Sequence, residues 1–134
     1  RNPQAIRPWQ HVLEPLSGYM LLASKMWKEP TKYCEGWNFG PRAESIVPVW
    51  DVATDVIKNY GSGQLNDIST PNTLHEAKLL MLDISKAKFL LGWEPRMNIH
   101  QCIALTVDWY KRYKDEDVYA LCLEQIETYL AYGK

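Results

Sequence analysis

The sequence predicts a mostly helical α+β fold with a few short strands. Several segments repeat apolar residues every three or four positions, which is the period of an α-helix. The candidate strands are short and lie far apart in the sequence. The 134 residues are 46% hydrophobic, enough for the core of a single domain. Such a chain forms a helical layer around a small sheet, or it is half of a larger protein whose sheet lies mostly elsewhere.

Two helices are predicted in the N-terminal half. The first begins at Glu14 and Pro15, because proline suits the first turn of a helix, and it ends before Pro30. Its expected apolar face consists of Leu16, Tyr19, Met20, Ala23, Met26 and Trp27. The second begins at about Pro48 and ends at Gly61, since glycine readily adopts the left-handed conformation that stops a helix. Its apolar face consists of Val49, Val52, Ala53, Val56, Ile57 and Tyr60.

Three further helices are predicted in the C-terminal half. Ser85 is expected to cap a short helix over residues 86–91. Asn98 is expected to cap a longer helix over residues 99–113, and a last helix covers residues 118–132. The apolar face of the longer helix consists of Ile99, Cys102, Ile103, Thr106, Val107 and Tyr110.

Short extended segments are predicted at residues 37–40, 64–69 and 79–82. The last of these is continuously apolar and too short for a helix, which indicates a buried strand. Trp93 follows a glycine that ends a helix, and we expect it in the core rather than at a stacking site.

The composition argues against several classes of protein. The net charge of −1 argues against nucleic acid as a partner, because binding a phosphate backbone needs a basic face. No apolar run reaches the roughly 18 residues of a membrane span, so no membrane association is expected. The three cysteines form no Cys-x-x-Cys pair, which disfavours zinc, and their odd number suggests a reducing cytoplasm. Cys102 and Cys122 are expected to be small buried thiols.

The residues alone offer no complete active site, but one segment suggests a ligand. The chain has no Gly-x-Ser-x-Gly turn and no glycine-rich phosphate loop. Arg7 is followed by Trp9, Gln10 and His11, which combine a fixed cation with hydrogen-bonding groups and a ring. The planar guanidinium fits phosphate oxygens, which indicates a phosphate-bearing ligand. In the alternative interpretation, Arg7 pairs with a surface carboxylate and Trp9 lies in the core.

A second candidate lies in the loop before residues 79–82. This loop contains His75 and Glu76, and loops that enter a buried strand are common ligand positions. A histidine there can donate to phosphate or hydroxyl oxygens. The alternative is a solvated loop histidine without a ligand.

Residues 7–19, which read RPWQHVLEPLSGY, resemble a signature of the CDP-glucose 4,6-dehydratases. These form a branch of the extended short-chain dehydrogenase/reductase family, the NAD-dependent epimerases and dehydratases. The agreement continues through EGWNFGP at 35–41, HEA at 75–77, and the DISKAK and LGWEP motifs within 83–95. The last segment is shared across the superfamily, whereas the first and third point to the CDP-glucose branch.

The resemblance implies a specific activity for the intact enzyme. Such enzymes hold NAD on an N-terminal Rossmann domain, oxidise C4 of the sugar, remove water across C5 and C6, and return the hydride to C6. CDP-D-glucose thus becomes CDP-4-keto-6-deoxy-D-glucose, which feeds dideoxysugar synthesis for the O-antigen of bacterial lipopolysaccharide.

The motifs of the family's redox half are absent from this sequence. Neither the glycine-rich loop nor the Tyr-x-x-x-Lys pair occurs, and the chain starts at Arg1-Asn2-Pro3. We therefore expect residues 1–134 to be the C-terminal nucleotide-sugar-binding domain, a cytoplasmic fragment that holds no catalytic residue and is inactive alone.

The resemblance also implies roles for individual residues. Arg7 matches the family arginine that contacts the nucleotide diphosphate, and Gln10 is placed to bond base or ribose. His75 and Glu76 match a substrate loop in which Thr73 stands where relatives carry arginine, which leaves His75 as the polar substitute. We expect a CDP-sugar substrate and a homodimer. The alternatives are a relative that uses another nucleotide and a stand-alone helical interaction module.

Overall fold

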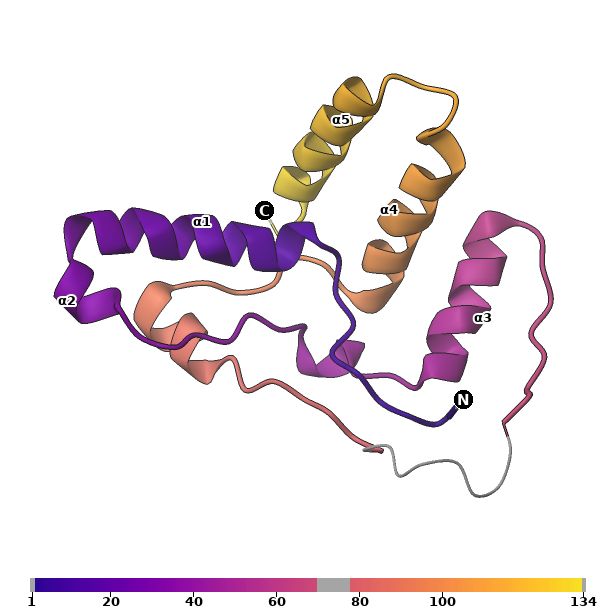
Figure 1. Cartoon of the computed structure of the whole chain (residues 1–134), viewed down its shortest axis with the longest axis horizontal. Helices are drawn as coiled ribbons and strands as arrows, with labels where there is room; N and C mark the ends of the chain where they lie inside the picture. The colour runs from indigo at the N-terminus through magenta and orange to yellow at the C-terminus, as the bar shows by residue number, and fades with distance from the viewer. Residues whose placement is uncertain (1, 70–77, 134) are drawn as a thin grey trace.

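The computed structural model describes residues 2–69 and 78–133, and within them helices joined by long irregular segments make up the chain (Figure 1). In chain order the elements are α1 (Leu13–Lys28), α2 (Pro30–Tyr33), the 3₁₀ turn η1 (Ala43–Ser45), α3 (Val49–Tyr60), the π-helical turn η2 (Ala87–Leu91), α4 (Ile99–Arg112) and α5 (Val118–Ala131). The five predicted helices are therefore confirmed within a residue or two of their expected ends, apart from the geometry of η2.

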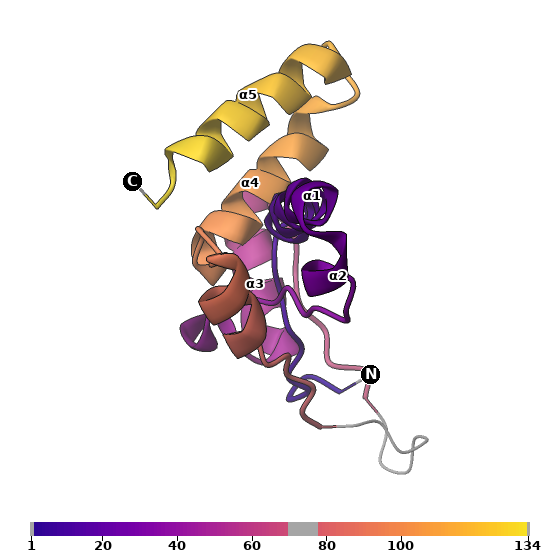
Figure 2. The ribbon, with the colours of Figure 1, turned by 90° about the vertical axis from the view of Figure 1, so that its left-hand side faces the viewer.

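Helix α2 lies at the last turn of α1, and the longer helices lie towards its first turn (Figure 1). Helices α4 and α5 form a hairpin that meets this turn, and α3 packs beside α4 (Figure 1). Figure 2 looks along α1 and shows α2 folded back beneath it. No helix among the described residues has both the length and the apolar character needed to cross a bilayer.

Side-chain caps fix the ends of the C-terminal helices. The Asn98 side chain accepts the Gln101 N–H at 3.0 Å, and Gln101 Oε1 accepts the Asn98 N–H at 2.9 Å, a reciprocal capping box that confirms the predicted start of α4. Asp117 accepts two backbone N–H groups at the start of α5, at 2.8 and 3.0 Å. Gly61 ends α3 with φ +91°, as predicted.

The cap predicted at Ser85 is wrong. Asp83 Oδ1 accepts the Ser85 N–H at 2.8 Å, so the aspartate takes the capping role two residues earlier. The helix that follows widens to π geometry over Ala87–Leu91 and stops at Gly92 with φ +73°.

None of the three predicted strands forms a ladder within the described residues. Two single bridges are present instead, and both involve Ile6, which lies antiparallel to Pro48 and parallel to Leu79. Residues 79–82, expected to be buried, are between 37% and 55% exposed. The physical reason is that a strand needs neighbours on its edges, and of these three segments only 79–82 carries a bridge, from Leu79 to Ile6, which lies outside all of them.

The core consists of three small clusters rather than one. Under α1 lie Tyr33, Phe39, Ala87, Leu91 and Trp93. Between α4 and α5 lie Met97, Cys102, Leu105 and Tyr129. Between α4 and α3 lie Ile99, Ile103 and Val107, against which Trp9 packs. The prediction that Trp93 belongs to the core is confirmed.

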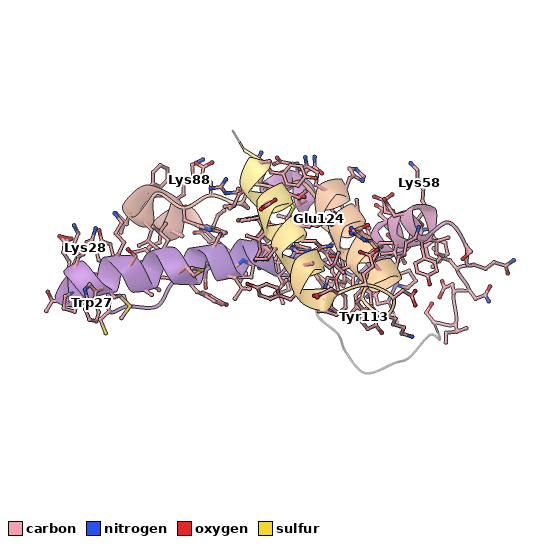
Figure 3. The ribbon with its side chains drawn as sticks, turned by 90° about the horizontal axis from the view of Figure 1, so that it is seen from above. Trp27, Lys28, Lys58, Lys88, Tyr113 and Glu124 are labelled. Carbon is pink, nitrogen blue, oxygen red and sulfur yellow. The ribbon has the colours of Figure 1, made fainter. Side chains whose placement is uncertain are left out.

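Helix α1 buries a different face from the one predicted. Its inner side carries the buried Glu14 and Gly18, and Leu21 and Leu22 pack against the cluster beneath it. Of the predicted face, Met26 also packs against this cluster. Most of the predicted face points to solvent instead, including Trp27, which is 90% exposed at the far end of the helix from α5 (Figure 3). The helix is therefore apolar on two opposite sides, and periodicity alone cannot tell which side faces the core.

Candidate functional site

The segment that carries Arg7 is extended and held on both sides. Ile6 N donates to Lys78 O at 2.9 Å, and Val49 N donates to Ala5 O at 3.0 Å. Arg7 is half-buried, and its Nη1 donates to the carbonyl of Ile6 at 2.8 Å. The guanidinium is therefore carried on a fixed backbone. Two residues later, Trp9 Nε1 donates to Val47 O at 3.2 Å.

The side-chain amide of Gln10 uses its nitrogen in a hydrogen bond, whereas its oxygen has no partner among the described residues. Its Nε2 donates to the Phe39 carbonyl at 3.0 Å, which ties the Arg7 segment to residues 37–40. Its Oε1 is buried and accepts no hydrogen bond from the described residues. The predicted role of Gln10 in nucleotide binding stays a prediction, and only the acceptor side of the amide is available for it.

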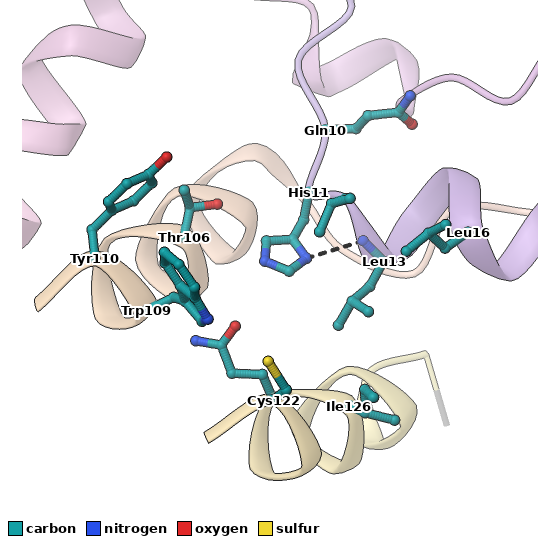
Figure 4. Close-up of a pocket in the computed structure, with 11 residues that line it drawn as sticks. Gln10, His11, Leu13, Leu16, Thr106, Trp109, Tyr110, Cys122 and Ile126 are labelled. Carbon is teal, nitrogen blue, oxygen red and sulfur yellow. Dashed lines mark hydrogen bonds between the residues drawn. The ribbon is translucent and has the colours of Figure 1, made fainter. Parts of the chain in front are cut away.

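A cavity of about 540 Å³ lies where the start of α1 meets α4 and α5 (Figure 4). It is lined by Gln10, His11, Val12, Leu13, Leu16, Thr106, Trp109, Tyr110, Cys122, Gln125 and Ile126. The structure thus brings Gln10 and His11 to this pocket, while Arg7 is not among the residues that line it. The lining is largely apolar, with a few polar groups, which is the usual character of a small-molecule or side-chain pocket.

His11 is one of two buried polar residues that line this pocket, and Gln125 is the other. His11 is 6% exposed, and its Nδ1 accepts the Leu13 N–H at 3.3 Å, the dashed line of Figure 4. Burial lowers the pKa of His11 below its usual value, so the ring is neutral at pH 7 with its proton assigned to Nε2. It offers one neutral donor and is not a cation for a phosphate.

The two helical cysteines differ from each other. Cys102 is buried as predicted, and burial raises its pKa to about 11, which leaves a protonated and unreactive thiol. Cys122 was expected to be buried too, but it is exposed, because it lies on the side of α5 that faces the open pocket.

A buried hydrogen-bond network behind the pocket was not predicted. Glu14 is fully buried, and its Oε1 accepts the backbone N–H groups of Arg96 at 2.8 Å and Met97 at 2.7 Å. The Tyr129 hydroxyl lies 3.0 Å from Glu14 Oε2 and 2.9 Å from Ser17 Oγ. The only signal in the sequence is that Glu14 lies on the same helical face as Gly18 and Leu21.

The second predicted site lies outside the described residues. His75 and Glu76, together with Thr73, belong to the part of the chain for which no placement is described, so their roles stay predictions. Within residues 2–69 and 78–133, no three His, Cys, Asp or Glu side chains come together to hold a metal ion.

Comparison with known proteins shows that this chain is similar to a nucleotide-sugar enzyme. No family model matches the chain. It is 40% identical over 132 residues to CDP-glucose 4,6-dehydratase of Salmonella typhimurium. The chain matches a C-terminal part of that enzyme. The match covers 98% of this chain but 37% of the relative, so the chain spans little more than a third of the relative's length. The resemblance inferred from residues 7–19 is confirmed, and the mostly helical structure is compatible with it.

Proposed function

We propose that this chain is the C-terminal, nucleotide-sugar-binding portion of a CDP-glucose 4,6-dehydratase. The 40% identity over 132 residues carries this proposal. The intact enzyme converts CDP-D-glucose to CDP-4-keto-6-deoxy-D-glucose and water in the cytoplasm, as a homodimer, and supplies dideoxysugar synthesis for O-antigen. Residues 1–134 bind the substrate and are inactive alone.

In this proposal the redox chemistry belongs to the other portion of the enzyme. When bound to that portion, NAD would supply the oxidant for C4 of the sugar and, once reduced, the hydride for C6. The chain itself does not fit that cofactor, since its seven glycines form no glycine-rich turn that could cradle a dinucleotide. An N-terminal Rossmann domain is therefore part of the proposal, and this chain contributes binding and orientation.

Arg7 is the residue that we assign to the diphosphate of the substrate. Support comes from the bridged backbone at Ile6 and from the hydrogen bond that Arg7 Nη1 donates to the Ile6 carbonyl, since both reduce the ordering that binding requires. A charge-assisted contact to a phosphate contributes about 1.5–3 kcal/mol. Gln10, His75 and Glu76 are assigned to the same substrate site as secondary contacts.

The test uses the intact enzyme with Arg7→Ala. We expect weaker CDP-glucose binding by about 1.5–3 kcal/mol, seen mainly as a higher KM, because the lost contact exists before the reaction begins. Arg7→Lys is the matched control, since it keeps the charge but loses the planar guanidinium. Its KM should lie between that of the wild type and that of Arg7→Ala. An unchanged KM in both variants removes Arg7 from the site. Competition among CDP, UDP and dTDP then decides which nucleotide the enzyme uses.

A further inference from the structure

The pocket where the start of α1 meets α4 and α5 is lined by uncharged side chains. Among the described residues, eleven line it, and none of these is Asp, Glu, Lys or Arg. Burial lowers the pKa of His11, so this ring is neutral at pH 7 as well. Arg7, which we assign to the diphosphate of the substrate, does not line the pocket. An uncharged ligand therefore suits this pocket, because a buried anion would find no cation in it.

Two buried side chains each bring a polar atom to this pocket that has no partner among the described residues. His11 is 6% exposed, and since its Nδ1 accepts the Leu13 N–H, its proton is assigned to Nε2, on the ring edge that points towards α4 (Figure 4). Gln125 is 5% exposed, and its Nε2 donates to the Leu105 carbonyl at 2.9 Å, which leaves its Oε1 as an acceptor. A buried polar group without a partner costs free energy, so a ligand that pairs with both atoms is favoured.

The α4 side of the pocket is an aromatic wall that is already ordered. Trp109 stacks on Tyr113 with ring centroids 4.5 Å apart and an angle of 4° between the planes, and Tyr110 meets Trp109 edge-on at 5.3 Å. Leu13 and Ile126 line the pocket from α1 and α5 (Figure 4). A flat ring can pack against this wall without a further loss of side-chain freedom. The volume of about 540 Å³ lies within the usual range for small-molecule sites.

We propose that this pocket binds an uncharged lactam-type heterocycle, which is a flat ring with an N–H next to a C=O, as in nucleobases. The ligand carbonyl accepts the His11 Nε2–H, the ligand N–H donates to Gln125 Oε1, and the ring packs against Trp109. A hydrocarbon ring would leave both protein atoms without a partner. The site is separate from Arg7, so the inference goes beyond the proposed function and does not rest on it.

The test is a titration of the intact enzyme with 2-pyridone, the simplest ring of this class, followed by NMR of the ligand. Toluene has the ring without the polar pair, and benzoate has the ring with a negative charge. We expect 2-pyridone to bind about tenfold or more tightly than either, because only 2-pyridone makes both hydrogen bonds without burying a charge. Toluene or benzoate binding as tightly as 2-pyridone overturns the proposal. So does a failure of 2-pyridone to bind at millimolar concentration.

Substitutions on α5 locate the bound ring. Ile126→Trp and Cys122→Phe each put a larger side chain into the pocket, and each should weaken 2-pyridone binding by about tenfold or more. Leu123→Trp is the matched control, because Leu123 lies on the same helix, is 44% exposed and does not line the pocket. Melting temperatures check that the variants are folded, and the comparison of the three probes needs no variant. Wild-type binding of 2-pyridone in both folded pocket variants would place the ring elsewhere and refute the proposal.

Competition with CDP distinguishes this site from the substrate site. Saturating CDP should leave 2-pyridone bound, and Arg7→Ala should leave its Kd unchanged. Displacement of 2-pyridone by CDP would make the pocket part of the substrate site and overturn the inference of a separate one. An enzyme that binds 2-pyridone as expected but binds no CDP-sugar supports this inference and refutes the proposed function.

Discussion

The hydroxyl of Tyr129 lies 3.0 Å from Oε2 of Glu14, a residue 115 positions earlier in the chain. This contact joins α5 to the first turn of α1. Through its other oxygen, Glu14 also holds the backbone that leads into α4, because it accepts the N–H groups of Arg96 and Met97. Three distant segments therefore meet at one buried carboxyl group, directly beside the pocket.

Removing this carboxyl group should be among the most damaging single changes. Glu14→Ala leaves two buried backbone N–H groups without their acceptor and takes one of two partners from the Tyr129 hydroxyl, and we expect a loss of about 3–5 kcal/mol in the free energy of unfolding. Glu14→Gln keeps an acceptor for both N–H groups and should cost about 1 kcal/mol. Urea unfolding measures both variants. Similar losses in the two would show that the hydrogen bonds are not what the side chain contributes.

Tyr129 should make the protein sensitive to alkali. Burial, with Glu14 close by, raises the pKa of Tyr129 to about 12, against 10.0 for an ordinary tyrosine. Between these values the unfolded chain loses the proton first, so this contribution to stability is complete below pH 10 and is lost as the pH rises towards 12. The difference in unfolding free energy between wild type and Tyr129→Phe should therefore shrink over this range. A constant difference would contradict the assignment.

His11 should make the protein less stable as the pH falls below neutral. Burial lowers its pKa below the ordinary 6.5, so as the pH falls through 6.5 the unfolded chain binds a proton before the folded one does. Stability should fall with pH in this window, by up to about 1.4 kcal/mol per pH unit. His11→Asn is the control, because its side-chain oxygen can still accept the Leu13 N–H but does not titrate. Parallel curves for wild type and variant between pH 7 and 5 would exclude this role.

Gly18 should not tolerate even one methyl group. A Cβ there would lie 2.2 Å from Cδ1 of Phe39, and that ring is itself packed edge-on against Trp93 with centroids 5.0 Å apart. We expect Gly18→Ala to destabilise the chain by about 1–3 kcal/mol, although alanine favours helix. Gly36→Ala is the matched control, because no atom lies within 4 Å of its Cβ position, and its melting temperature should stay unchanged. A Gly18→Ala variant as stable as this control would show that the ring can move.

The sequence predicted what depends on nearby residues. The ends of α3 and α4 follow from Gly61 and from the Asn98–Gln101 pair, each of which acts within a few positions. The prediction of three strands was wrong because strand pairing depends on segments that are distant in the sequence. The prediction of the buried face of α1 was wrong because the helix is apolar on two sides, and tertiary packing decides which of them is buried.

The site was predicted in part for the same reason. Gln10 and His11 reach a pocket, but its other walls come from α4 and α5, about a hundred residues later, which no local pattern connects to them. Glu14 was missed as a network residue because a carboxyl group in the first turn of a helix usually faces solvent and favours the helix dipole. Its burial becomes visible only when Tyr129 and the 96–97 backbone are in place.

The two bridges of Ile6 bear on the order in which the molecule assembles. Ile6 is among the first residues of the chain, yet it is bridged to Pro48 and Leu79, which come more than 40 and 70 positions later. Closing such long loops is slow, so the strand-like piece beside Arg7 should be among the last parts to settle during folding. Until the two bridges form, Arg7, which we assign to the phosphates, has no fixed position. A ligand that binds Arg7 only in the folded state would therefore favour the last step of folding.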